Sequence, residues 1–263
     1  MRRTVSLYAG FFALSLKARL AYKADFFGEI LASLLGTVSG ILFVVLLFHR
    51  IHDLNGWPRE HVFFMYGLSL IPYGLFNIFS INLYEFPERY IVEGRFDRLL
   101  LRPMPTLTQL LLEKIRLTSL QEMVVGLGIA VWAGNQLELS WKATDILWLG
   151  VTVVSGAVIY FSVFSILSSL SFFFEDRIGL IPPIWNMVQF GRFPVPIFGP
   201  WLGAILSWVI PFAFVSFYPA THFLQKSGFR TLCYLTPLVA LVCGLVCLGV
   251  WSLGVRGYRS TGS

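Results

Sequence analysis

The chain has 263 residues, of which 56% are hydrophobic and 13% are charged, and its mean hydropathy is +0.73. Soluble domains carry about 25% charged residues, so this composition excludes a soluble domain and predicts an integral membrane protein. The net charge of +6 is interpreted as membrane topology and contact with anionic lipids, and it does not imply nucleic-acid binding.

The first predicted element covers residues 4–24, where apolar and basic side chains are interspersed. Leu7, Phe11 and Leu14 recur at three- and four-residue spacing, and Lys17 follows on the approach to the first apolar run. This pattern is typical of an amphipathic helix that lies at the membrane surface. We therefore predict an interfacial helix here; a poorly ordered N-terminal arm is the alternative.

The membrane spans are predicted from apolar runs, because a helix needs about 20 mostly apolar residues to cross a bilayer. Five runs qualify: 26–48, 62–84, 117–134, 146–174 and 231–254. A further apolar region, 178–217, is interrupted by prolines, which remove a backbone donor and kink helices. It is predicted to supply a sixth span and a re-entrant or interfacial helix pair over 196–218.

The expected fold is therefore an all-α polytopic membrane protein with six transmembrane helices, in which residues 1–263 form a single domain. The sequence does not decide whether 178–195 or 198–218 is the fifth complete span. Lys and Arg favour cytoplasmic loops, and a topology with both termini inside leaves only six of the 20 such residues outside. Those six are Arg50, Arg59, Lys142, Arg192, Lys226 and Arg230.

Motifs for catalysis are absent from the sequence. It contains no phosphate-binding P-loop, no H-E-x-x-H and no G-x-S-x-G. His49 and His52 are interpreted as solvated residues at the membrane edge, and Cys243 and Cys247 as packing residues of the last span. We therefore predict no catalytic residues, no metal site and no cofactor bound by this chain.

The second span carries a polar stripe. Its members recur at steps of three or four residues and fall within a sector roughly 80° wide on a helix: Tyr66, Ser69, Tyr73, Asn77, Ser80 and Tyr84. The remaining surface, including Leu68, Leu70 and Ile78, is compatible with lipid. The stripe is interpreted either as hydrogen bonding between helices or as the wall of a translocation path for an amphipathic solute, and the sequence favours neither.

Other polar residues lie inside the predicted spans. Ser155, Ser162, Ser165 and Ser169 form a seam on the fourth span that indicates close helix packing. Glu122 lies inside the third span, where an ionisable residue suggests function. The alternative is a carboxylate near the interface that faces Arg116 or a neighbouring helix.

A charged connector, residues 88–105, joins the second and third spans. If it is helical, one side is apolar and can face the acyl boundary; its residues are Val92, Phe96, Leu99, Leu100 and Pro103. Arg95, Arg98 and Arg102 then gather on another face, within about 60°. Gly94 should interrupt the helix, while Pro103 and Pro105 should end it. The connector is interpreted as a docking element or as charge that only sets the topology.

The run E-G-R-F-D-R-L-L-L-R-P at 93–103 resembles the signature loop of permease subunits of type-2 ABC exporters. Three other segments are similar to that family in the expected order: Gly56-Trp57, the proline-bounded segment 210–220 and the terminal segment 251–262. Together these matches span most of the chain. Phe96 departs from the family, in which an aliphatic residue is expected.

The resemblance implies a permease of the bacterial inner membrane that pairs with a second copy or a sister permease. Two cytoplasmic ATPase subunits would bind ATP and Mg. Residues 4–24 would be an elbow helix, 196–218 re-entrant helices and 88–105 the coupling helix. The coupling residues would be Arg89, Gly94, Arg95, Phe96, Asp97, Arg98, Leu100, Arg102 and Pro103.

The leading hypothesis is ATP-driven export of a lipophilic, amphipathic or peptide-like compound, with membrane lipids as further partners. The polar stripe is the candidate substrate path, by its geometry alone. The alternatives are an ATPase-independent channel or ion-coupled carrier, and an intramembrane enzyme or scaffold. A channel or carrier should contain more buried charge than Glu122 alone.

Overall fold

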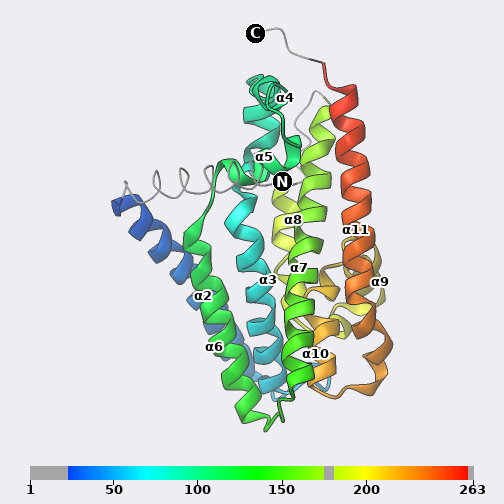
Figure 1. The fold of residues 1–263 in the computed structure, drawn as a ribbon. Helices are drawn as coiled ribbons and strands as arrows, with labels where there is room; N and C mark the ends of the chain where they lie inside the picture. Colours follow the sequence, from blue (N-terminus) through cyan, green and yellow to red (C-terminus); the bar gives the residue numbers. More distant parts are fainter. Residues whose placement is uncertain (1–22, 175–180, 260–263) are drawn as a thin grey trace.

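The computed structural model describes residues 23–174 and 181–259, and every regular element in these ranges is a helix (Figure 1). The all-α expectation is confirmed. The predicted elbow helix lies outside the described residues, apart from its last two, which begin α2. The longer helices are α2 (Lys23–Arg50), α3 (Arg59–Glu85), α6 (Leu120–Gln136), α7 (Ala143–Ser169) and α11 (Arg230–Gly257).

Five continuous helical segments are long and apolar enough to cross a membrane: Phe26–Arg50, Arg59–Val92, Leu117–Gln136, Ala143–Phe172 and Thr231–Gly257. A helix pair bent by 75°, Val195–Val209 and Phe212–Phe223, makes a sixth if it is counted as one span. The bend falls at Pro211, which cannot continue the helical hydrogen bonds. The described chain thus has five or six spans, with the break in the predicted proline-rich region.

Helix α3 forms the centre of the bundle, with α6 on one side and α7 on the other, and α11 packs against α7 (Figure 1). In the apolar stretch of α3, 89% of the residues are buried. Leu68, Leu70 and Ile78 are buried, so this surface of α3, although compatible with lipid, is covered by protein. Neighbouring helices, which the sequence of one segment does not reveal, cover it.

Helices α3 and α6 approach each other closely at glycines. A Cβ atom on Gly67 would lie 2.6 Å from the backbone nitrogen of Ala130, and one on Gly126 would lie 2.7 Å from the carbonyl oxygen of Gly67. A Cβ atom on Gly74 would likewise meet Met123 of α6 and the carbonyl oxygen of Ser119, just before this helix. The absence of side chains at these positions lets the two backbones touch.

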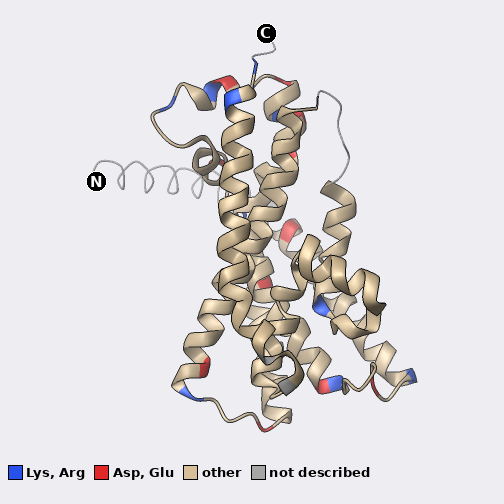
Figure 2. Cartoon of the chain, turned by 90° about the vertical axis from the view of Figure 1, so that its right-hand side faces the viewer, with Lys and Arg blue, Asp and Glu red and all other residues tan. Residues whose placement is uncertain are grey.

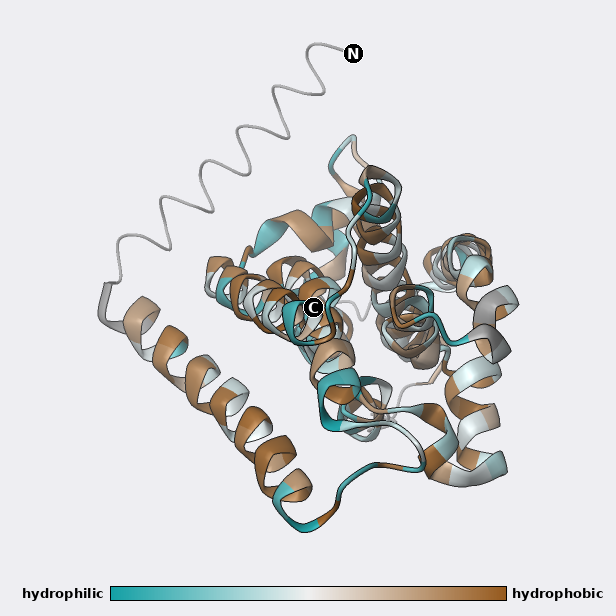
Figure 3. Ribbon diagram, turned by 90° about the horizontal axis from the view of Figure 1, so that it is seen from below, coloured by the Kyte–Doolittle hydropathy of each residue, from teal (hydrophilic) through white to brown (hydrophobic). Residues whose placement is uncertain are grey.

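Helix α2 lies apart from the rest of the bundle and its surface is largely apolar (Figure 3). Only 6% of the residues in its apolar stretch are buried. It meets the bundle at few described points: Thr118 donates to Glu29 at 3.3 Å, Ser33 reaches α6, and Gly40 lies against the Tyr66 hydroxyl. Gly36, expected to share a packing face with Gly40, has no neighbour within 4 Å of an added Cβ.

The second span is longer than predicted. Beyond α3 the chain continues as a π-helix over Phe86–Val92. Pro87 stands at its start and has no backbone N–H, which removes one ordinary helical bond. The backbone of Glu93 then bonds to the carbonyl of Glu88, five residues earlier, at 3.0 Å. Arg89 therefore belongs to the extended second span.

The serine seam of the fourth span is buried in the bundle. The hydroxyl groups of Ser155, Ser162 and Ser169 each donate to the carbonyl four residues earlier, at 2.6–2.7 Å. Their polar groups are thereby satisfied within α7, and its surface stays smooth for contact with α3 and α11. This arrangement agrees with the packing interpretation.

Candidate functional site

The connector is divided into short pieces. Glu93, Gly94 and Arg95 separate the π-helix from α4 (Phe96–Leu100), which has five residues. Gly94 adopts φ of +71°, a conformation that favours glycine. A turn through Pro103 and Pro105 then leads to α5 (Thr106–Glu113). The segment 88–105 is thus not one continuous helix, and its break lies at the glycine where interruption was expected.

Phe96 holds the connector to the bundle. Its side chain is fully buried, with ring-centroid distances of 5.8 Å to Phe86, 5.0 Å to Phe172 and 4.9 Å to Tyr258. These partners come from the ends of the second, fourth and last spans, and Trp251 completes the cluster at 6.4 Å. The prediction that the apolar side of the connector, with Phe96 and Leu99, can face the acyl boundary is wrong for these two residues, because both are buried inside the protein.

Hydrogen bonds fix the same segment. The amide of Gln109, on α5, donates to the carbonyls of Leu99 at 3.0 Å and Met104 at 2.6 Å. The Trp251 indole donates to the Thr106 hydroxyl at 3.0 Å. A motion of the connector would therefore be transmitted to α5 and α11.

The cationic side of the connector is exposed. Arg95, Arg98 and Arg102 are exposed, as are Leu100 and Pro103. Figure 2 shows charged residues gathered mainly at the two ends of the bundle. Arg95 pairs with Glu93 at 2.9 Å.

Besides Phe96, two charged residues among the predicted coupling residues contact the bundle. Arg89 pairs with Glu85 at 2.8 Å, along the extended second span. Asp97 is half-buried; burial of Tyr258, together with the negative charge of Asp97, raises the pKa of Tyr258 to about 12. The predicted coupling residues thus separate into an exposed group and a group fixed to the spans.

The polar stripe faces several different neighbours. The hydroxyl of Ser69 donates within α3 to the carbonyl of Tyr66 at 2.7 Å, and that of Ser80 donates to Asn77 at 3.3 Å. The rings of Tyr73 and Tyr84 pack on Trp185 of α8 (Ile181–Met187), at centroid distances of 5.5 and 4.7 Å. Ser69 and Ser80 thus form hydrogen bonds within α3 itself, whereas Tyr73 and Tyr84 contact α8 through their rings.

Glu122 joins three helices. Its carboxylate accepts hydrogen bonds from Asn77 of α3 at 2.9 Å and from Ser33 of α2 at 3.1 Å, and the side chain is 9% exposed. The described contacts thus agree with the neighbouring-helix alternative. The guanidinium Nε of Arg116, the other expected partner of Glu122, lies 3.9 Å from the carboxylate of Glu29.

Arg192 was expected in an outer loop, but it is only 7% exposed. It ends a short 3₁₀ helix, Phe190–Arg192. Its guanidinium lies 5.3 Å from the ring centre of Tyr66 and 5.2 Å from that of Tyr73, and it donates to the Tyr66 hydroxyl at 3.4 Å. The assignment of Lys and Arg residues to loops placed Arg192 outside the membrane and did not reveal its burial. The signal that could have found it is an arginine inside a mainly apolar region.

An apolar cavity of about 410 Å³ lies beside this arginine's partner Tyr66, between α2 and residues 189–198. Its lining residues are Gly40, Phe43, Leu47, Leu54, Tyr66, Gln189, Phe190, Phe193, Ile197 and Phe198. Tyr66 thus connects the polar stripe with a space that an apolar group could fill.

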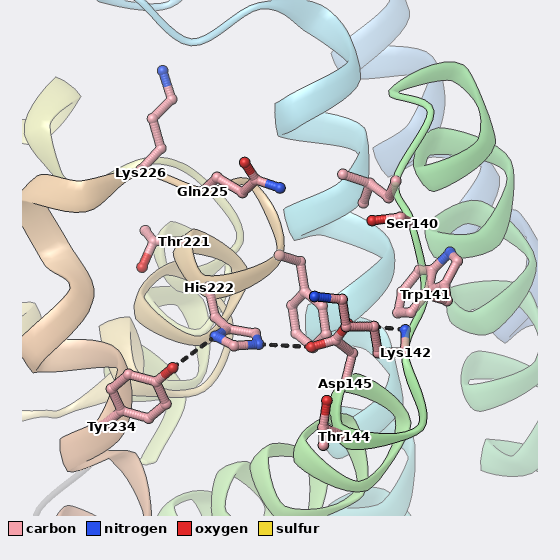
Figure 4. A pocket seen from close by; sticks show the side chains of 12 residues that line it. Ser140, Trp141, Lys142, Thr144, Asp145, Thr221, His222, Gln225, Lys226 and Tyr234 are labelled. Atoms are coloured by element: carbon pink, nitrogen blue, oxygen red, sulfur yellow. Dashed lines mark hydrogen bonds and ion pairs between the residues drawn. The ribbon is translucent and has the colours of Figure 1, made fainter.

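A second pocket of about 510 Å³ (Figure 4) lies around the start of α7, at the opposite end of the bundle from α4 (Figure 1). His222, on α10 (Phe217–Phe223), lies 3.0 Å from the carboxylate of Asp145 and 3.2 Å from the hydroxyl of Tyr234. These contacts join α7, α10 and α11. The pocket was not predicted, because its residues come from separate loops and helix ends.

Comparison with known proteins gives a match to a family model described as "ABC-2 family transporter protein", which covers residues 34–262. The matched range contains both the connector and the polar stripe. Searches of curated proteins and of solved structures give no significant match.

Proposed function

Because this chain belongs to the ABC-2 transporter family, and is thus a membrane permease of an ABC transporter, we propose that it exports a lipophilic, amphipathic or peptide-like compound. The family implies an ABC ATPase as a partner. We place the protein in the bacterial inner membrane with both termini in the cytoplasm. ATP and Mg are bound by the ATPase subunits, and this chain has the role of a non-catalytic permease.

The proposal that the connector couples the ATPase to the spans rests on the burial of Phe96. Of the exposed arginines, Arg98 lies on the five-residue helix α4, and Arg95 and Arg102 flank it; its aromatic anchor, Phe96, contacts the ends of three spans. Arginine binds carboxylates in a fork geometry, so Arg95, Arg98 and Arg102 suit an acidic groove on the ATPase. Movement of that groove on ATP binding would then reach α3, α7 and α11 through rigid aromatic contacts.

The polar stripe of α3 is the proposed substrate path. Tyr66 borders a cavity, and Asn77 and Glu122 supply polar groups at membrane depth. A second copy of the chain, or a sister permease, would complete the path. Because α3 is covered by its neighbours in the single chain, transport requires that these helices separate during the cycle.

Copurification of the ATPase tests the proposal. The tagged wild-type chain, extracted in mild detergent, should retain an ATPase subunit, and Arg98→Glu and Arg102→Glu should each reduce the retained amount about tenfold or more. Arg50→Glu is the matched control, because Arg50 is an exposed arginine at the far end of α2.

Equal ATPase retention by wild type, Arg98→Glu and Arg102→Glu would contradict docking through the connector. Solute flux in proteoliposomes that contain this chain without any ATPase would instead favour an ion-coupled carrier or a channel.

A further inference from the structure

We infer that Arg192 and the adjoining apolar cavity form a binding site for an anionic amphiphile, with Arg192 near the head group and the cavity around the apolar tail. The inference rests on the proposed function, since it names the substrate class of the same path. The Arg192 site is defined here as Arg192, Tyr66, Tyr73 and the cavity between α2 and residues 189–198.

The position of the charge is the first observation. Tyr66 and Tyr73 stand seven and fourteen residues after the start of α3 at Arg59, or about 10 and 21 Å along the helix axis. The guanidinium contacts both rings. It therefore lies beside the second span and not in a loop beyond it. A charged side chain in such a position is costly and marks a functional site by default.

The charge is poorly compensated. A guanidinium has five N–H donors and does not lose its proton in proteins. Among the described residues, Arg192 donates one hydrogen bond to a side chain, the hydroxyl of Tyr66, at 3.4 Å. The ion pairs formed among the described residues involve other groups. Two cation–π contacts offset only part of the desolvation cost of a buried charge.

An anionic ligand group would offset the rest. A phosphate or carboxylate accepts two parallel hydrogen bonds from one guanidinium, and it would gain strength from the low dielectric around Arg192. Binding of a cationic or neutral head group would leave the charge uncompensated. The electrostatics therefore select for a negative head.

The cavity supplies the other half of the ligand. Its volume of about 410 Å³ is in the range of ligand pockets, and Phe43, Leu47 and Phe198 contribute apolar walls. Tyr66 forms one wall and also contacts Arg192, so the apolar space and the charge both adjoin one tyrosine. A ligand that spans this tyrosine must combine an acidic head with an apolar tail.

Access is from the side of α2. Phe43 contributes to the cavity and is 57% exposed on α2, and its ring lies 6.2 Å from that of Phe193. An amphiphile dissolved in the bilayer could therefore enter laterally between α2 and residues 189–198, with no passage through water.

The test is equilibrium binding to the full-length chain in nanodiscs of zwitterionic lipid. Radiolabelled dodecyl phosphate is the probe, and dodecyl maltoside and inorganic phosphate compete for it. Wild type should bind the probe, and neither the neutral amphiphile nor phosphate alone should displace it at equal concentration. Arg192→Gln should weaken binding about tenfold to a hundredfold, the effect of losing a charge-assisted hydrogen bond.

Matched variants separate binding from folding. Arg192→Lys keeps the charge and should recover part of the affinity, while Arg50→Gln removes an exposed arginine and should leave binding unchanged. Should Arg192→Gln fail to fold, Leu47→Trp keeps the arginine and fills the cavity, and it should also weaken binding of dodecyl phosphate. Thermal melting of each variant checks that the fold is intact.

Three results would overturn the site: equal affinity of folded Arg192→Gln and wild type, unaltered binding by Leu47→Trp, or displacement of the probe by inorganic phosphate or dodecyl maltoside alone. Failure of the proposed function looks different. If no ATPase copurifies but dodecyl phosphate still binds through Arg192, the site stands and the ATPase coupling fails. If an ATPase copurifies but Arg192→Gln binds normally, coupling stands and the site fails.

Discussion

The side-chain amide of Asn77 donates a 2.9 Å hydrogen bond to the carboxylate of Glu122, and Ser33 donates to the other carboxylate oxygen at 3.1 Å. One buried acid thus connects α2, α3 and α6. Since α2 makes few other described polar contacts with the bundle, Glu122 has a large share in holding it.

Replacement of Glu122 by Ala is expected to destabilise the protein, because the buried donor Asn77 loses its acceptor, at about 1–3 kcal/mol for a buried unsatisfied group, and the half-buried Ser33 loses its acceptor as well. Glu122→Gln should have a smaller effect, since its amide keeps one acceptor oxygen. The midpoint of thermal unfolding in detergent measures both. Glu138→Ala is the control, because Glu138 is exposed in the loop after the same helix; an equal shift for Glu122 and Glu138 would contradict the role assigned to the carboxylate.

A pair of glycines on α6 gives a second prediction. Gly126→Ala should destabilise the α3–α6 contact, because its Cβ would lie 2.7 Å from the carbonyl oxygen of Gly67, whereas Gly128 has no neighbour within 4 Å. Gly128→Ala should be neutral or stabilising by about 1 kcal/mol, since alanine favours the helix. Thermal melting of the two variants gives the comparison, and similar melting points would rule out the close backbone approach.

Truncation of Phe96 tests the aromatic anchor. Phe96→Ala removes a fully buried ring, and such a change typically costs about 3–5 kcal/mol. We expect ATP hydrolysis by the assembled complex to persist while transport in proteoliposomes is lost. Leu101→Ala, at 86% exposure, should alter neither. Normal transport by Phe96→Ala would show that the cluster does not transmit the motion.

The orientation of the chain can be tested by labelling cysteines in intact cells with an impermeant maleimide. A cysteine at Leu101, on the connector, should remain unlabelled, and one at Glu138, at the opposite end of the bundle, should react. Background should be low, because Cys233 and Cys247 are buried and Cys243 is half-buried. Reaction at position 101 without cell disruption would reverse the proposed topology.

The helices could be predicted because each span needs a long apolar run, which one segment carries by itself. The burial of α3 could not, since Leu68 and Leu70 look the same in sequence whether lipid or another helix covers them. The break at Gly94 was visible in the residue type. The burial of Phe96 could not be predicted, because its partners lie near the ends of three separate spans.

The polar residues likewise divide into a part that the sequence predicts and a part that it does not. Spacing alone placed Tyr66, Tyr73 and Asn77 on one side of α3. Their partners come from elsewhere: Arg192 from the proline-broken region and Glu122 from α6. Rules that assign positive residues to loops treat Arg192 as topological charge, and only the folding of that region against α3 brings it to the tyrosines.

The enclosure of α3 on all sides has a consequence for how this protein can vary. Along α2, tolerance to substitution should rise and fall with the turn of the helix, because one flank alone meets the bundle. Along α3 this periodicity should be absent, and nearly every position should be intolerant of bulkier or charged replacements. A saturation scan of both segments would thus mark α3 as a continuous stretch of intolerance, whatever cargo the transporter carries.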